Sequence, residues 1–195
     1  GFLPAAEARN LLAEAGRAAN ASERASAYVA TLLAAARDRE PRNLSATFTD
    51  LQGLRNEQDP VRQEVALTLQ GIPAWLLADA GIAPVRGFAD AIAAARDTSQ
   101  RTLSALQHTA WAVVSEALSR DDAALAQDAL GIVAALTNPT GGPVIPSLLG
   151  LPHGAELTII DSLLPRLRRA ADKDDYTLLL ALCHALGKRA WGVPA

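Results

Sequence analysis

The chain of 195 residues contains one cysteine, no methionine and few aromatic side chains, which make up 4% of the sequence. A single cysteine, Cys183, excludes an internal disulfide and fits a reducing compartment, so we expect a cytoplasmic protein. No apolar run is long enough to span a bilayer, so no membrane partner is expected. Because methionine is missing even at position 1, we also expect the chain to be a piece of a longer protein.

Residues that carry catalytic or metal chemistry are also scarce. A zinc site needs three or four converging ligands, and the chain has only His108, His153 and His184 beside its cysteine. On a helix, Cys183 and His184 would diverge by about 100°. The glycines at 141–142 lack the lysine and the strand–helix context of a phosphate-binding loop. We therefore predict no catalytic, cofactor-binding or metal-binding residue, no small-molecule site, and a protein that is not an enzyme.

What the chain has instead is alanine, in runs such as 34–36 and 93–95. Alanine has the highest helix propensity and allows helices to approach closely. β-Branched and aromatic residues never gather into alternating runs, as they do in strands. The composition therefore predicts an all-α fold.

Apolar residues recur at helical spacing along the whole chain and predict about ten helices in a single domain, residues 1–195. Three similar four-residue motifs, each ending in aspartate, occur at 35–38, 94–97 and 169–172. They predict hairpin turns between paired helices. The irregular segment 138–155 is interpreted as a crossover between pairs, with a functional loop as the alternative. The stripe predicted to be buried in the last helix includes Tyr176, Leu179, Leu180, Cys183 and Leu186.

The segment 59–69 reads as a tight turn that enters an amphipathic helix, with Asp59 as its cap and Pro60 in its first turn. Asp59, the Val-Arg pair ending at Arg62 and the aliphatic residues that follow resemble the inter-helix turn and second helix of a HEAT-type repeat. The resemblance implies antiparallel helical pairs stacked into a short curved solenoid. It also implies a structural ladder through Asp59 and Arg62, and a binding face lined by the second helix of each pair.

HEAT and armadillo-like proteins are mostly non-catalytic binding or scaffold modules, so the resemblance implies that role here, with another protein as the partner. A net charge of −3 disfavours nucleic acid. One alternative is nevertheless a nucleic-acid-binding or DNA-repair domain similar to helical-repeat glycosylases. It would use the main basic concentration, which comprises Arg166, Arg168, Arg169 and Lys173, with Lys188 and Arg189 farther along. The other alternative is a structural spacer in a larger bacterial protein, with the basic residues as a solvated helix face.

Overall fold

The computed structural model describes residues 3–136, 145–146, 148–187 and 189, and this part of the chain contains ten α-helices and no strand. The prediction of an all-α fold is confirmed. The helices are α1 (Ala5–Leu12), α2 (Ala21–Arg37), α3 (Pro41–Asp50), α4 (Asp59–Gln70), α5 (Ala74–Ala80), α6 (Ala83–Ala94), α7 (Gln100–Ser119), α8 (Ala123–Ala135), α9 (Ala155–Ala171) and α10 (Thr177–Leu186). Short 3₁₀ helices cover η1 (Ala15–Arg17), η2 (Leu51–Asn56) and η3 (Leu148–Gly150).

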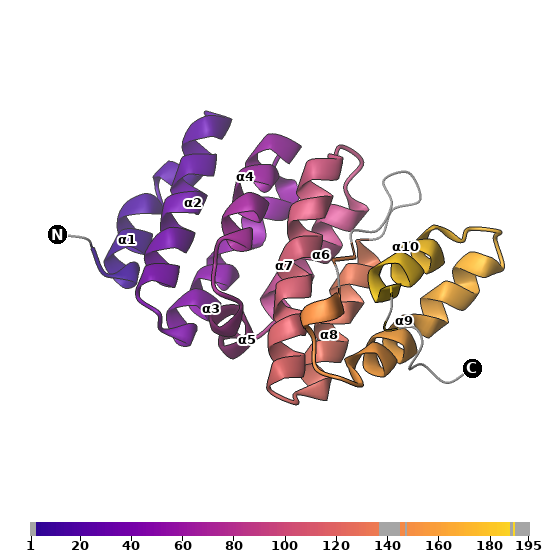
Figure 1. Ribbon diagram of the computed structural model, residues 1–195. Helices are drawn as coiled ribbons and strands as arrows, with labels where there is room; N and C mark the ends of the chain where they lie inside the picture. Colours follow the sequence, from indigo (N-terminus) through magenta and orange to yellow (C-terminus); the bar gives the residue numbers. More distant parts are fainter. Residues whose placement is uncertain (1–2, 137–144, 147, 188, 190–195) are drawn as a thin grey trace.

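Three of the helices stand side by side as a row, with α4 packed between α2 and α7 (Figure 1). We call α2, α4 and α7 the central row. Helices α1, α3, α6 and α8 form successive contacts beside it, and α5 packs against both α3 and α7. At the C-terminal end α9 packs on α8, and α10 packs on α9. The fold therefore places α2, α4 and α7 in one layer, and the helices between them in sequence lie outside that layer.

Helix α7 shows how the sequence specifies an element of this row. The Ser99 side chain accepts a hydrogen bond from the Thr102 N–H and so caps the helix N-terminus. Its apolar stripe is buried as the periodicity predicts, and Trp111 on the same helix is only 2% exposed. A buried aromatic side chain of this size contributes strongly to the stability of the core, so α7 is one of its main elements.

Helix α4 begins one residue earlier than predicted, so the expected capping role of Asp59 is wrong. Gln58 occupies the N-cap position without a side-chain cap, and Asp59 is the first helical residue. Its carboxylate accepts a hydrogen bond from Thr102 of α7 instead. Pro60 lies in the first turn as expected, where its missing N–H would have no helical partner anyway.

The orientation of α10 also differs from the prediction. Tyr176, Leu179, Leu180 and Cys183 are exposed, and the buried face consists of Leu178, Leu182, Ala185 and Leu186. Cys183 is therefore not the core residue that its spacing suggested. Both sides of this helix are rich in leucine and alanine, so the periodicity did not distinguish the side that packs on α9 and η3.

Residues 138–144 and 147 of the irregular segment 138–155 lie outside the described residues. Within the described part, η3 leads through Gly154, at φ 91°, into α9. Helix α9 begins at Ala155, so Pro165 lies in its interior. None of the described helices is both long enough and apolar enough to cross a membrane.

Candidate interaction surface

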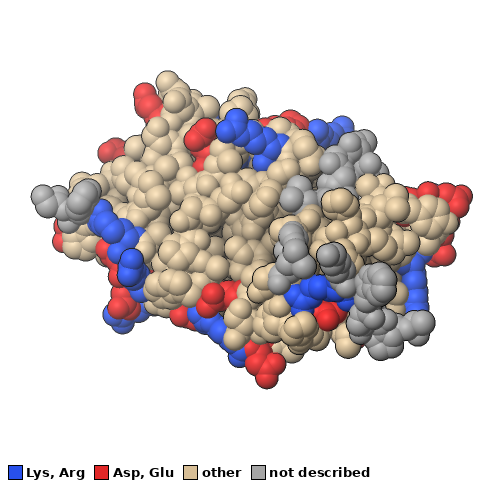
Figure 2. All heavy atoms as spheres, viewed as in Figure 1, with Lys and Arg blue, Asp and Glu red and all other residues tan. Residues whose placement is uncertain are grey.

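The central row contains three long stretches without a charged side chain. Residues 25–36 of α2, 65–70 of α4 and 102–115 of α7 include no Asp, Glu, Lys or Arg. Figure 2 shows the result on this side of the molecule, where uncharged residues cover the centre and charged residues lie around the rim. We call the surface of these three stretches the charge-poor face.

The side chains that reach solvent on this face are small or uncharged. They comprise Ser26, Val29, Ala30 and Leu33 of α2, Leu67 and Gln70 of α4, and Ser104, His108, Ala112 and Ser115 of α7, each set at the spacing of one helix side. The Ser115 hydroxyl donates to the Trp111 carbonyl at 3.0 Å, and His108 Nδ1 lies 2.8 Å from the Ser104 carbonyl. Because these polar groups are bonded to their own helix, they add little polarity to the surface.

Polar contacts join the three helices at the edge of the face where each helix begins. Arg24, in the first turn of α2, forms two parallel hydrogen bonds of 2.8 Å with the carboxylate of Glu57, which lies two residues before α4. Its third nitrogen donates to the carbonyls of Ala18 and Ala19. The hydroxyl of Tyr28 lies 3.5 Å from Glu57, and burial together with that carboxylate raises the pKa of Tyr28. This is the first link between neighbouring helices.

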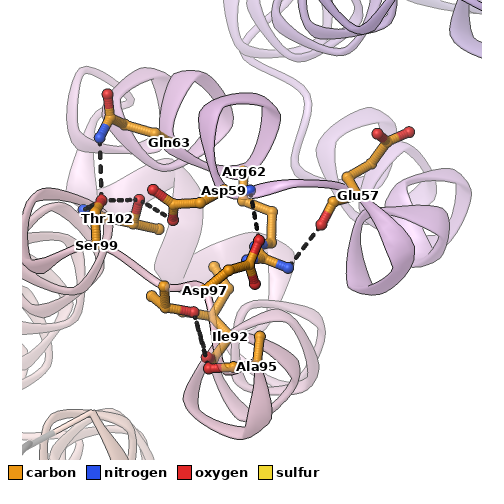
Figure 3. A network of polar contacts seen from close by, with 10 residues as sticks. Glu57, Asp59, Arg62, Gln63, Ile92, Ala95, Asp97, Ser99 and Thr102 are labelled. Carbon is orange, nitrogen blue, oxygen red and sulfur yellow. Dashed lines mark hydrogen bonds and ion pairs between the residues drawn. The ribbon is translucent and has the colours of Figure 1, made fainter.

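The second link joins α4 to α7 in the same way (Figure 3). Arg62, in the first turn of α4, donates at 2.6 Å to Asp97, which precedes α7, and at 2.7 Å to the Glu57 carbonyl. The Arg62 hydrogen bond is the main cause that holds the pKa of Asp97 below its usual range. Beside it, the Thr102 hydroxyl donates to Asp59 at 2.8 Å.

The two links show that the starting ends of α2, α4 and α7 lie next to one another. Since α4 packs along both other helices, the three run in the same direction, and the helices between them return the chain. Both residues predicted for the ladder, Asp59 and Arg62, take part in the second link. Their partners Asp97 and Thr102, and the whole first link, were not found from the sequence.

The predicted basic concentration lies on α9 and the turn after it, on two sides of the helix. Arg166, Arg169 and Lys173 follow one side by their spacing, and Arg168 points about 100° away from Arg169. Arg166 is half-buried, and burial together with the charge of Arg169 lowers its pKa. Exposed Asp172 and Asp174 stand in the same turn as Lys173. These residues therefore do not make one continuous cationic surface.

A second buried arginine network, which sequence reasoning missed, fixes the entry to α9. Arg189 donates to the carbonyls of Leu148, Leu151 and Pro152 and to Glu156 Oε2, at 2.6 to 2.8 Å. Hydrogen bonds from backbone N–H groups, chiefly that of Glu156 itself, and the charge of Arg189 hold the pKa of Glu156 below its usual range. No local pattern pairs residues so far apart in sequence, and the network has the form of a structural clamp.

The residues with potential for chemistry do not converge in the described part of the chain. No group of three His, Cys, Asp or Glu side chains in it could hold a metal ion. His184 and Cys183 are exposed on α10. Asp122 caps α8 by accepting a hydrogen bond from the Leu125 N–H at 3.0 Å.

Comparisons with models of protein families, with curated proteins and with solved structures found no match. The resemblance of residues 59–69 to a HEAT-type repeat therefore stays a prediction. A function has to be argued from the geometry of the chain itself.

Proposed function

We propose that this chain is a non-catalytic module that binds another protein through the charge-poor face. In this proposal the helical pairs stack as a short solenoid of the HEAT or armadillo-like kind, and the central row supplies the second helix of each pair. The observation that carries the proposal is the row itself, in which three helices of one direction present adjacent charge-free stretches.

The links at the helix starts support the solenoid part of the proposal. In stacked repeats each unit contacts mainly its neighbours, and their helices line one extended binding surface. Arg24 and Arg62 occupy the same position, the first turn of successive row helices, and each binds an acidic residue just before the next one. This repetition keeps neighbouring helices in register, as the predicted ladder requires.

The chemistry of the face favours a protein partner over a nucleic acid. The centres of protein–protein interfaces are depleted of charged residues and surrounded by a polar rim. Binding to nucleic acid depends on Lys and Arg contacts with phosphate, and the three stretches of the face contain neither residue. The exposed Leu33, the small residues of α7 and the charged rim match the first description.

The proposal can be tested by placing a charge in the middle of the face. We expect Ala112→Glu on α7 to abolish recovery of proteins that the unmodified chain retains from a nuclease-treated lysate of its source. Ala93→Glu on α6 is the matched control, because Ala93 is also an exposed helical alanine but lies outside the central row. Circular dichroism would verify that both variants keep their helix content.

Three outcomes would contradict this function. Equal recovery with both variants would place the binding surface elsewhere. Retention that depends on nucleic acid and is lost on replacing Arg166 and Arg169 would favour the nucleic-acid alternative. If the unmodified chain retains no protein, the alternative of a structural spacer gains support.

A further inference from the structure

An apolar cavity of about 320 Å³ lies on the side of α4 that faces away from the charge-poor face. Val65 and Leu69 of α4 line the cavity and are fully buried. Leu67 of the charge-poor face is two residues from each of them, and therefore about 200° around the helix. The cavity and the face are thus separate features of the same helix.

The walls of the cavity come from α3, η2, α4 and α6 and are almost entirely apolar. They consist of Phe48, Leu51, Leu54, Val65, Leu69, Ala83, Pro84, Gly87, Phe88 and Ala91, with Thr49 and Arg55 as the polar members. The Thr49 hydroxyl donates to the Ser45 carbonyl of its own helix, so it does not require a ligand. The cavity is at the lower end of the size range of pockets that bind small molecules.

Among the described lining residues, Arg55 is the one with a charged side chain. It is exposed, so it stands where the cavity meets solvent, and it forms no ion pair with the described side chains. The half-buried Arg24 and the buried Arg62 near α4 are both engaged, since Arg24 binds Glu57 and Arg62 binds Asp97. Guanidinium groups bind carboxylates with two parallel hydrogen bonds, which fixes both position and charge.

We propose that this cavity is a binding site for a small apolar carboxylate, such as a medium-chain fatty acid. The hydrocarbon part lies between α3 and α6 against Val65 and Leu69, and the carboxylate pairs with Arg55. The apolar walls exclude a polar ligand body, because its buried polar groups would find no hydrogen-bond partner there. The guanidinium of Arg55 at the opening selects an anionic end group. This site is independent of the proposed protein-binding function.

Gly87 provides a way to close the cavity without disturbing its walls. It lies inside α6 and lines the cavity, and a Cβ added to it would meet no atom within 4 Å. A larger side chain at this position therefore extends into open space. Because Gly87 lines the cavity, we expect the larger side chain of Gly87→Leu to occupy part of it, whereas Gly87→Ala adds only one methyl group at the same helical position.

The test is calorimetric titration of the chain with decanoate, below its micelle-forming concentration, and with decanol as the uncharged probe of equal chain length. We expect saturable binding of decanoate and weaker binding of decanol. Arg55→Gln should weaken decanoate binding about fivefold, the effect of losing one solvent-exposed ion pair, and leave decanol binding unchanged. Gly87→Leu should abolish binding of both probes, and Gly87→Ala should retain it.

Several results would overturn the proposal. Absence of decanoate binding to the unmodified chain would do so, as would equal binding by Gly87→Leu, shown by circular dichroism to be folded. Equal loss of decanoate and decanol binding in Arg55→Gln would refute the role of the guanidinium. Ala112→Glu should leave decanoate binding intact, so failure of the proposed protein-binding function would remain distinguishable from failure of this site.

Discussion

Arg62 offers the sharpest test of how the central row is held together. Its side chain is only 3% exposed, yet it carries a charge that binds Asp97 at one nitrogen and the Glu57 carbonyl at another. Its third nitrogen, Nε, is buried without a hydrogen-bond partner. The substitution Arg62→Met keeps a side chain of similar length and removes the charge and both bonds.

The size of the effect follows from opposing contributions. Hydrogen bonds from a charged group contribute about 1.5–3 kcal/mol each, so the loss of two of them is substantial. Removing a desolvated guanidinium, one of whose nitrogens is already unpaired, offsets part of that loss. Asp97 stays largely hydrated, because its side chain is 57% exposed. We therefore expect Arg62→Met to lower the free energy of unfolding by about 2 kcal/mol, which lowers Tm by about 4–8 °C for a chain of this length.

Urea unfolding followed by circular dichroism measures this change, and Arg86→Met supplies the matched control. Arg86 also pairs with an aspartate, Asp128, but both side chains are about half exposed, at 47% and 57%. Such surface pairs contribute about 0–1 kcal/mol. If Arg62→Met is as stable as the unmodified chain, or changes stability no more than Arg86→Met does, the reasoning about the buried link is refuted.

Three further predictions concern single contacts. Trp111→Ala should lower the free energy of unfolding by about 3–5 kcal/mol, because the side chain is fully buried. A denaturant titration measures this change, and a value below about 1 kcal/mol would contradict the place of Trp111 in the core. Asp122→Ala should lower it by about 1 kcal/mol through loss of the α8 cap, and Asp122→Asn should restore most of that loss in thermal unfolding. Because the pKa of Asp97 is lowered in the folded state, its contribution to stability is present above the unfolded pKa of about 4 and is lost as pH falls below it. The stability difference between the unmodified chain and Asp97→Asn should therefore shrink between pH 5 and pH 2, and a difference that is constant over this range would disprove the coupling to Arg62.

The sequence predicted helices best where apolar and polar residues alternate clearly. In α7 the stripe from Leu103 to Ala117 is buried as its spacing indicates. In α10 the same reasoning selected the wrong side, because leucines and alanines occupy both sides and only the position of α9 decides which one is buried. Periodicity locates a helix, but it does not identify its neighbours.

The candidate sites were predictable only in part, for the same reason. The phrase around Asp59 and Arg62 marked two residues of the second link, but Asp97 and Thr102 are supplied by a segment 35 and 43 residues away. The sequence contains the three charge-free stretches of the charge-poor face, but they form one surface only when α2, α4 and α7 pack side by side in the central row. The cavity is lined by residues of α3, η2, α4 and α6, and no local pattern indicates that these segments come together.

The sequence distance spanned by the links has a consequence for how the chain folds during synthesis. Arg24 reaches Glu57 across 33 residues, Arg62 reaches Asp97 across 35, and Asp59 reaches Thr102 across 43. The second residue of each link is therefore translated soon after the first. The entropic cost of closing a chain segment of this length is modest. Since chains emerge from the ribosome N-terminus first, α2 can dock on α4 before α7 exists. We expect the central row to assemble in order, one helix at a time, with each new member stabilising the one before it.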